Sequence, residues 1–197
     1  MTTTPNPYDL FLVRRFFDAP TCERIVAEMR AAEGVPAAVY GRGESGSVDE
    51  RARRTVRLSP SRETAEFVRR RLLGCKAEVA AHFGVGLGDC EEPQFLRYRT
   101  GDFFAAHQDG NTGLLRLESD AARRVSTVIF LSRQSEAPEP GSYCGGALVF
   151  SDWRTGRADY SLRGEPGTLA AFRSETTHEV RPVTHGERLS IACWYVR

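Results

Sequence analysis

The stretch FLRYRTGDFFAAHQD, residues 95–109, decides the fold because it combines strand-like alternation with side chains that bind metals. Residues i and i+2 of a strand point to the same face, so His107 and Asp109 share one face while Gln108 points to the other. From residue 94 onward, more short apolar or alternating runs follow, separated by turn residues, as in RVSTVIFLS (124–132) and GGALVF (145–150). This pattern favours a β-sandwich or jelly roll over a parallel α/β sheet.

Two downstream residues extend this constellation. His178 follows Asp109 by sixty-nine positions, and Arg188 lies ten positions further on. Because His178 is distant in sequence, it must come from a second strand that lies beside the first. Two imidazoles and one carboxylate can bind Fe(II) on one side and leave positions open for a co-substrate and O2. The sequence therefore predicts an iron site at His107, Asp109 and His178. The alternative is a hydrogen-bonded strand histidine at 107 and a surface histidine at 178.

Composition is typical of one globular domain. A chain of 197 residues buries roughly 70% of its unfolded surface, so we expect a single domain over 1–197. We expect its part at about 1–90 to be helical and its part at about 91–197 to form the jelly-roll catalytic core. The net charge of +1 gives no indication of nucleic acid or an anionic membrane as partner.

Location is inferred from the absence of targeting signals and from the cysteines. No apolar run approaches the roughly 20 residues of a membrane helix, and the first residues show no secretory signal. The five cysteines are scattered and include no CxxC pair, which is typical of reduced thiols. We therefore expect a cytoplasmic protein.

Two helices are predicted in the N-terminal part. The first, from Thr21 to Ala32, follows start signals at Asp18 and Pro20. The second runs from about Arg62 to His82, carries apolar residues every three or four positions, and ends at Gly84. Segments 41–47, 110–122 and 132–143 are predicted as loops or insertions.

Five motifs in order give the chain a family resemblance. They are FLRYRTGDFFAAHQD (95–109), RVSTVIFLS (124–132), GGALVF (145–150), PGTLAAF (166–172), and HEVRPV with GERLSIACW between 178 and 194. Together they resemble the prolyl-4-hydroxylase-like Fe(II)/2-oxoglutarate-dependent dioxygenases. The resemblance implies a mainly β fold with N-terminal helices, namely a double-stranded β-helix (jelly roll, cupin-like) core packed by two or more helices. It also implies Fe(II), 2-oxoglutarate and O2, with ascorbate as reductant.

The resemblance assigns the co-substrate pocket. Arg188 is expected to bind the distal carboxylate of 2-oxoglutarate, since a guanidinium offers a planar fork to a carboxylate; a structural salt bridge is the alternative. Tyr98 is expected to line the pocket, with core packing as the alternative. Many relatives carry a tyrosine where Phe130 stands, and its hydroxyl reaches the distal carboxylate. Here Ser126, Thr127 or a water is expected to replace that hydroxyl.

Substrate contacts are expected from two other places. In relatives, the aromatic residue corresponding to Trp194 borders the substrate pocket; a core tryptophan is the alternative. Arg54 and Arg57 belong to a segment (42–57) that can form a flexible loop over the site in relatives, so they are expected to grip substrate. The alternative is a solvated basic face. Halogenating relatives have a small residue in place of Asp109, so the carboxylate argues for hydroxylation.

The expected activity is hydroxylation of an unactivated C–H bond, on a prolyl or other side chain of a peptide or protein, with release of succinate and CO2. The same chemistry on a free amino acid or small metabolite is the main alternative. A nucleic-acid demethylase is disfavoured because that group has a second arginine six residues after the first, where Trp194 stands. A non-catalytic metal-binding domain on the same fold is a further alternative. We expect no nucleic-acid or membrane partner, and the sequence leaves the oligomeric state open.

Overall fold

The computed structural model describes residues 7–38, 49–110, 122–152 and 155–197. Its helices are α1 (Ala19–Ala31) and α2 (Arg62–Phe83). The strands before α2 are β1 (Leu10–Val13), β2 (Gly34–Pro36), β3 (Arg53–Arg54) and β4 (Val56–Leu58). Those after α2 are β5 (Gln94–Arg99), β6 (Phe103–His107), β7 (Arg123–Phe130), β8 (Arg133–Gln134), β9 (Ser142–Gly145), β10 (Leu148–Asp152), β11 (Arg157–Leu162), β12 (Leu169–Arg173), β13 (His178–Val180), β14 (Val183–His185) and β15 (Glu187–Val196).

Two antiparallel sheets form the jelly roll that the sequence predicts. A major sheet has the order β1-β12-β7-β15-β5-β4-β2, and a minor sheet has the order β11-β10-β13-β6-β3. Buried side chains between them, among them Leu96, Phe130, Phe150 and Phe172, make one hydrophobic core. A third, small sheet, β14-β9-β8, closes one end and contains the parallel pair β8 and β9. The expected mainly β fold with packed helices is confirmed.

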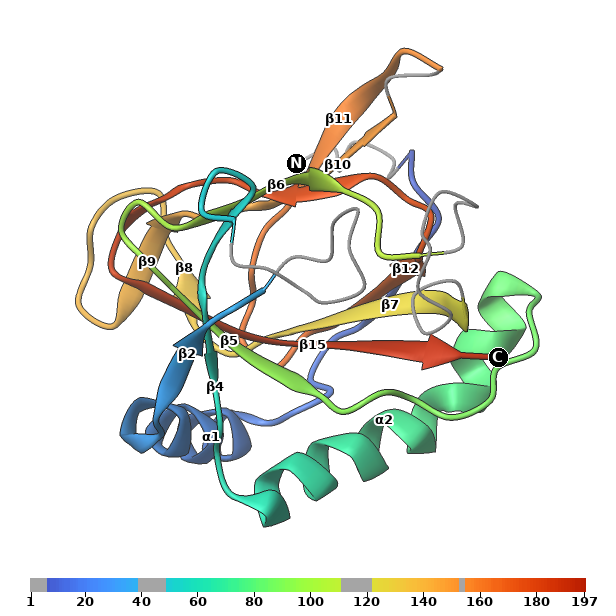
Figure 1. Cartoon of the computed structure of the whole chain (residues 1–197), viewed down its shortest axis with the longest axis horizontal. Helices are drawn as coiled ribbons and strands as arrows, with labels where there is room; N and C mark the ends of the chain where they lie inside the picture. Colours follow the sequence, from blue (N-terminus) through green and yellow to red (C-terminus); the bar gives the residue numbers. More distant parts are fainter. Residues whose placement is uncertain (1–6, 39–48, 111–121, 153–154) are drawn as a thin grey trace.

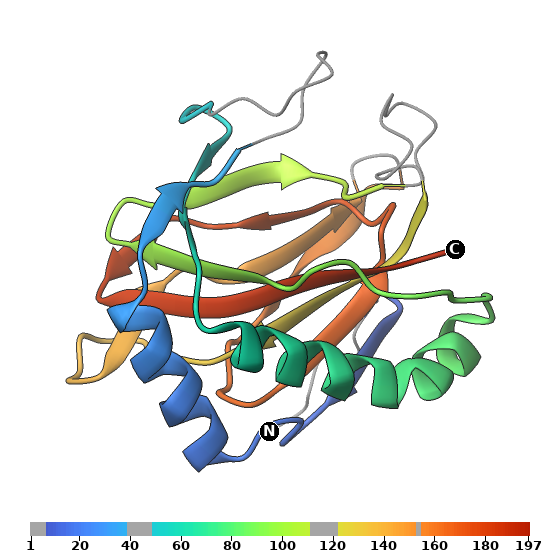
Figure 2. The same ribbon diagram turned by 60° about the horizontal axis from the view of Figure 1, so that its bottom comes forward.

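Both helices cover the outer face of the major sheet, opposite the minor sheet (Figure 2). Their apolar residues, such as Ile25 and Leu72, make a second core with Ile129 and Ile191 of the sheet. The Asp18 side chain accepts the Thr21 N–H at 3.0 Å and caps α1, which begins at Ala19, two residues earlier than predicted. Neither described helix is long and apolar enough to cross a membrane.

The N-terminal part is less helical than the sequence suggests. Strand β1 pairs with β12 at one edge of the major sheet, β2 and β4 extend the other edge, and β3 joins the minor sheet (Figure 1). These strands contain only two to four residues each, too few for a visible period, and form through pairing with distant strands. Segment 132–143, predicted as a loop, contributes β8 and the beginning of β9. Residues 41–47 and 111–121 of the predicted loops lie outside the described residues.

Candidate metal centre

Neighbouring strands of the minor sheet bring the three predicted metal ligands together. His107 on β6 is the register partner of His178 on β13. Asp109 follows β6, and its backbone N–H donates to the carbonyl of Ser174 at 2.9 Å. The Asp109 carboxylate lies 3.5 Å from Nε2 of His107 and 3.4 Å from Nε2 of His178. One ligand atom from each residue lies within 4.8 Å of the other two, close enough to share one metal ion.

Backbone carbonyls orient both imidazoles. Nδ1 of His107 lies 2.8 Å from the carbonyl of Ala105, and Nδ1 of His178 lies 3.0 Å from that of Thr176. Since a carbonyl only accepts hydrogen bonds, each Nδ1 is the donor, and Nε2 is the ring nitrogen left to bind a metal. Metal-binding histidines are commonly fixed in this way by a hydrogen bond from the other ring nitrogen.

The charge states also suit a cation. Burial lowers the pKa of His178 to about 4, so this imidazole is neutral near pH 7. Burial raises the pKa of Asp109, but His178 and His107 outweigh burial and hold this pKa below its usual range. A neutral imidazole at His178 and an ionised carboxylate at Asp109 are the protonation states in which these two residues bind a metal.

The three residues open into a cavity of about 510 Å³ between the two sheets. The wall formed by β5 and β15 includes Tyr98, Arg188 and Trp194. Toward the mouth the lining includes Val35 of β2 and Arg57 of β4. The structure thus gathers most of the predicted site residues around one space.

Arg188 lies in this cavity with an incomplete set of partners. Its side chain is 1% exposed, and Nη1 donates to Oγ of Ser190 at 2.7 Å. Nε and Nη2 are buried without a hydrogen-bond partner. The guanidinium lies 5.1 Å from the ring centre of Tyr98 and 5.6 Å from that of Phe130, and it forms no ion pair with the described carboxylates. A buried, unpaired guanidinium is costly, so this arrangement fits an anionic ligand and disfavours a structural salt bridge.

The two hydroxyls expected to replace the missing tyrosine are engaged elsewhere. Ser126 Oγ lies 3.0 Å from Oγ of Ser174, and the Thr127 hydroxyl donates to the Cys193 carbonyl at 2.9 Å. Ser126 is four residues from Phe130, about 13 Å along an extended strand. Both hydroxyls thus already have a partner within the chain, and of the two residues Thr127 lines the cavity.

Of the two arginines predicted to contact substrate, one lines the cavity and the other does not. Arg57 lines the cavity, whereas Arg54 is exposed and its guanidinium lies 4.0 Å from Glu50. Because alternate strand residues point to opposite faces, Arg53 takes the inward position on β3. Arg53 is 8% exposed, lines the cavity and lies 4.5 Å over the ring of Phe104, which in turn stacks on His107 at 3.6 Å. Because β3 contains only two residues, the sequence does not show which of them points inward.

Sequence reasoning also missed Arg123. Its guanidinium pairs with both carboxylate oxygens of Glu91 at 2.6 and 2.7 Å and lies 3.9 Å over the Trp194 ring. Its Nη1 is also 3.4 Å from the carbonyl of Asp109. Arg123 thus links the wall of the cavity to the backbone of a predicted metal ligand. Its position directly before the core strand motif was the only sequence signal.

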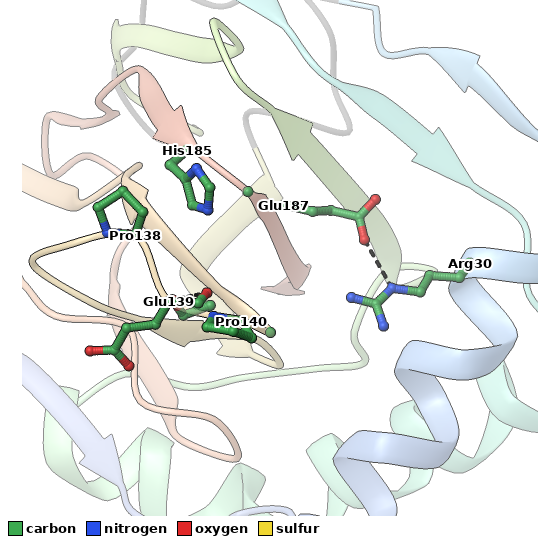
Figure 3. Close-up of a pocket in the computed structure, with 9 residues that line it drawn as sticks. Arg30, Pro138, Glu139, Pro140, His185 and Glu187 are labelled. Carbon is green, nitrogen blue, oxygen red and sulfur yellow. Dashed lines mark hydrogen bonds and ion pairs between the residues drawn. The ribbon is translucent and has the colours of Figure 1, made fainter.

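A second cavity of about 510 Å³ lies away from these residues, between α1 and the small sheet. Figure 3 shows the carboxylate of Glu187 pointing to Arg30 of α1, at 3.0 Å, with His185 and two prolines on the other wall. None of its described lining residues has a buried side-chain nitrogen or oxygen without a hydrogen-bond partner. We therefore assign no ligand to it.

Comparison with known families agrees with this geometry. The family model described as the 2OG-Fe(II) oxygenase superfamily matches residues 93–196, which contain all three candidate ligands and Arg188. The chain belongs to the 2OG-Fe(II) oxygenase superfamily. The match begins just before β5 and ends at the last residue of β15, so it covers the strands that carry the candidate ligands and Arg188 but not β2 to β4.

Curated members of the superfamily are similar over the same half of the chain. A PKHD-type hydroxylase from Shewanella sp. (strain MR-7) is 36% identical over 104 residues, which are 52% of this chain and 41% of the relative. One from Sphingopyxis alaskensis is 37% identical over 102 residues, 49% of this chain and 40% of the relative. The matched part thus spans about 40% of the length of these relatives.

Solved structures of this superfamily match nearly the whole chain. A Pseudomonas putida prolyl-4-hydroxylase has a TM-score of 0.70 and 26% identity, over 97% of this chain and 94% of that one. A Trichoplax adhaerens prolyl hydroxylase, solved with a peptide fragment of hypoxia inducible factor, has a TM-score of 0.69 over 96% of this chain and 84% of that one. At 16% identity, this second similarity concerns the fold alone.

Proposed function

We propose that this protein is an Fe(II)- and 2-oxoglutarate-dependent dioxygenase that hydroxylates a prolyl or other side chain of a peptide or protein. The observation that carries the proposal is one cavity that holds both a His107–Asp109–His178 cluster and the unpaired guanidinium of Arg188. The cluster suits a divalent iron, and the guanidinium suits a dicarboxylate co-substrate. Membership of the superfamily supports both roles.

The residues present fit the implied iron. His107 and His178 would hold it through Nε2, since their Nδ1 atoms are engaged with carbonyls, and Asp109 would hold it through its carboxylate. When bound together, iron, 2-oxoglutarate and O2 supply the oxidising chemistry, with succinate and CO2 as co-products. The protein supplies the ligands, fixes their orientation and limits access of water.

The residues around Arg188 fit the co-substrate. Arg188 would pair with the distal carboxylate, and Tyr98 would form the adjoining wall, since the guanidinium lies 5.1 Å from its ring centre. Two unpartnered guanidinium nitrogens can donate side by side to one carboxylate. This pairing would also neutralise a charge that is otherwise buried alone.

The mouth of the cavity supports a peptide or protein substrate. The lining of the cavity reaches the outer strand β2 of the major sheet, where Val35 is 61% exposed, and it also includes Arg53, Arg57 and Trp194. An exposed apolar residue on an edge strand suits contact with an extended chain. The peptide bound to the Trichoplax enzyme adds support by analogy of fold. Arg53 and Arg57 would then contact substrate in place of the pair Arg54 and Arg57.

The remaining elements of the proposal concern the reductant and location. Ascorbate would keep the iron reduced between turnovers. A cytoplasmic location is supported by the five cysteines, all of which are free thiols.

The test is succinate release from 2-oxoglutarate in the presence of Fe(II), ascorbate and O2. Reactions would contain no substrate, proline-containing peptides, or free amino acids. We expect peptides to give the largest stimulation and His107→Ala to abolish it. His185→Ala is the matched control, since it removes an exposed histidine on β14 that lies outside the cluster, and it should retain wild-type turnover.

The other outcomes distinguish the alternatives. Stimulation by free amino acids alone would replace the peptide substrate with a small metabolite. Equal succinate release by wild type and His107→Ala across the panel would contradict the assignment as an oxygenase and leave a metal-binding domain on the same fold.

A further inference from the structure

The cavity lacks one donor that the relatives have. Phe130, where many relatives carry a tyrosine, has no hydroxyl, and Ser126 and Thr127 are hydrogen-bonded elsewhere. Arg188 alone therefore faces the expected distal carboxylate with two unpartnered nitrogens. A carboxylate can accept about four hydrogen bonds, so a second donor beside Arg188 would strengthen binding.

Tyr143 brings a hydroxyl into this neighbourhood from a different strand. It lies on β9, is 1% exposed, and its Oη is buried without a hydrogen-bond partner. A buried hydroxyl without a partner destabilises the folded protein, so its retention points to a ligand that is not part of the chain.

Two glycines make room for this side chain. A Cβ added to Gly164 would lie 2.3 Å from Oη of Tyr143 and 3.1 Å from Cδ1 of Phe130. The hydroxyl of Tyr143 therefore lies beside the ring of Phe130. A Cβ added to Gly146 would lie 3.1 Å from Cδ of Arg188 and 3.2 Å from Cε2 of Tyr143, so the phenol ring also lies beside the stem of Arg188.

Near pH 7 both groups can donate a hydrogen bond to an anion. Burial raises the pKa of the Tyr143 hydroxyl, and the positive charge of Arg188 acts in the opposite direction without reversing the shift. The phenol is therefore protonated near pH 7, next to a permanently charged guanidinium. Two adjacent donor groups without an acceptor form an anion site that is complete only when an anion is bound.

We propose that Tyr143 replaces the hydroxyl missing at Phe130 and, together with Arg188, binds the distal carboxylate of the co-substrate. The phenol approaches Arg188 from β9, whereas a tyrosine at position 130 would approach it from β7. The inference rests on the proposed use of 2-oxoglutarate and extends it, because it makes Tyr143 a residue that selects a 2-oxo acid with a second carboxylate.

The test uses calorimetry to measure the equilibrium binding of two 2-oxo acids to the Fe(II)-loaded protein in the absence of O2. Pyruvate carries the same 2-oxo acid group as 2-oxoglutarate but no distal carboxylate. Tyr143→Phe should weaken 2-oxoglutarate binding about tenfold, the loss of one hydrogen bond to a charged group, and leave pyruvate binding unchanged. The thermal midpoint of the ligand-free variant should match or exceed that of wild type, since the hydroxyl has no partner to lose.

Tyr195→Phe is the matched control on the other face of the major sheet. The Tyr195 hydroxyl donates to the carbonyl of Leu72 at 2.5 Å, so its removal should lower the thermal midpoint and leave both affinities unchanged. Unchanged 2-oxoglutarate affinity in Tyr143→Phe, or equal weakening for both acids, would overturn the inference and leave the proposed function standing. If wild type binds no 2-oxoglutarate, both the inference and the proposed function are wrong.

Discussion

The two faces of strand β15 have different roles: one lines the cavity and the other packs against the helices. Its even-numbered residues Arg188, Ser190, Ala192 and Trp194 line the cavity, and its odd-numbered residues Leu189, Ile191, Cys193 and Tyr195 belong to the core beneath the helices. Buried polar side-chain atoms on the two faces also differ in whether they have hydrogen-bond partners. Arg188 Nε and Nη2 and Trp194 Nε1 are buried without partners, whereas the Tyr195 hydroxyl and the Cys193 thiol donate to backbone carbonyls.

This difference shows how one strand separates binding from stability. A face whose polar groups are all paired contributes to the free energy of folding and has nothing left to offer a ligand. A face with unpaired donors lowers stability and keeps those donors available for binding. Because the side-chain period is two, neighbouring residues can serve the two tasks without interfering.

The largest effect is expected when the charge on the cavity face is removed. Arg188→Met keeps an unbranched apolar stem but removes the guanidinium, so 2-oxoglutarate affinity should fall about a hundredfold or more. The free energy of unfolding of the ligand-free protein should stay unchanged or rise, since an unpaired buried charge is lost. Binding without O2 and chemical denaturation would measure the two quantities. A large decrease in the free energy of unfolding with little change in 2-oxoglutarate affinity would mean that Arg188 is a structural residue. The two faces of β15 would then not differ in role.

The next effect concerns the opposite face of the same strand. Ile191 is fully buried in the core beneath the helices. Ile191→Ala should lower the free energy of unfolding by about 2–5 kcal/mol through lost contacts and a cavity. Denaturant titration gives this number, and the affinity for 2-oxoglutarate should not change under conditions where the variant is folded. Weakened binding in the folded variant would mean that the two faces are coupled.

The smallest effect is expected in the helical layer, farthest from the cavity. The Asp18 side chain caps α1 by accepting the Thr21 N–H. Asp18→Ala should lower the free energy of unfolding by less than Ile191→Ala does and leave iron and 2-oxoglutarate binding as in wild type. Asp18→Asn keeps an acceptor and should restore most of the stability, which a capping role requires. Equal losses in both variants would point to the charge of Asp18 instead.

The sequence predicted the parts of the fold that depend on local pattern. The His107-x-Asp109 spacing, the long helix ending at Gly84 and the core strands from residue 94 onward all follow from periodicity and end signals. The strands before α2 were not predictable, since β1 to β4 are short and exist through pairing with distant strands.

The candidate site was predictable only where its residues lie in recognisable motifs. His107, Asp109, His178 and Arg188 carry enough local context to be chosen, and the structure brings them to one cavity. Tyr143 and Arg53 carry no such signal, because their positions depend on how β9 and β3 pack against other elements. A role for Tyr143 can be inferred only from the structure, which places Gly164 and Phe130 beside its hydroxyl.

The most direct test of the account is a count of iron ions bound per chain, measured by equilibrium dialysis without O2, with and without 2-oxoglutarate. Wild type and the surface variant His185→Ala should each bind one iron, His178→Ala should bind none under the same conditions, and 2-oxoglutarate should be retained only where iron is. Equal iron binding by wild type and His178→Ala would contradict the assignment of His107, Asp109 and His178 as the metal centre.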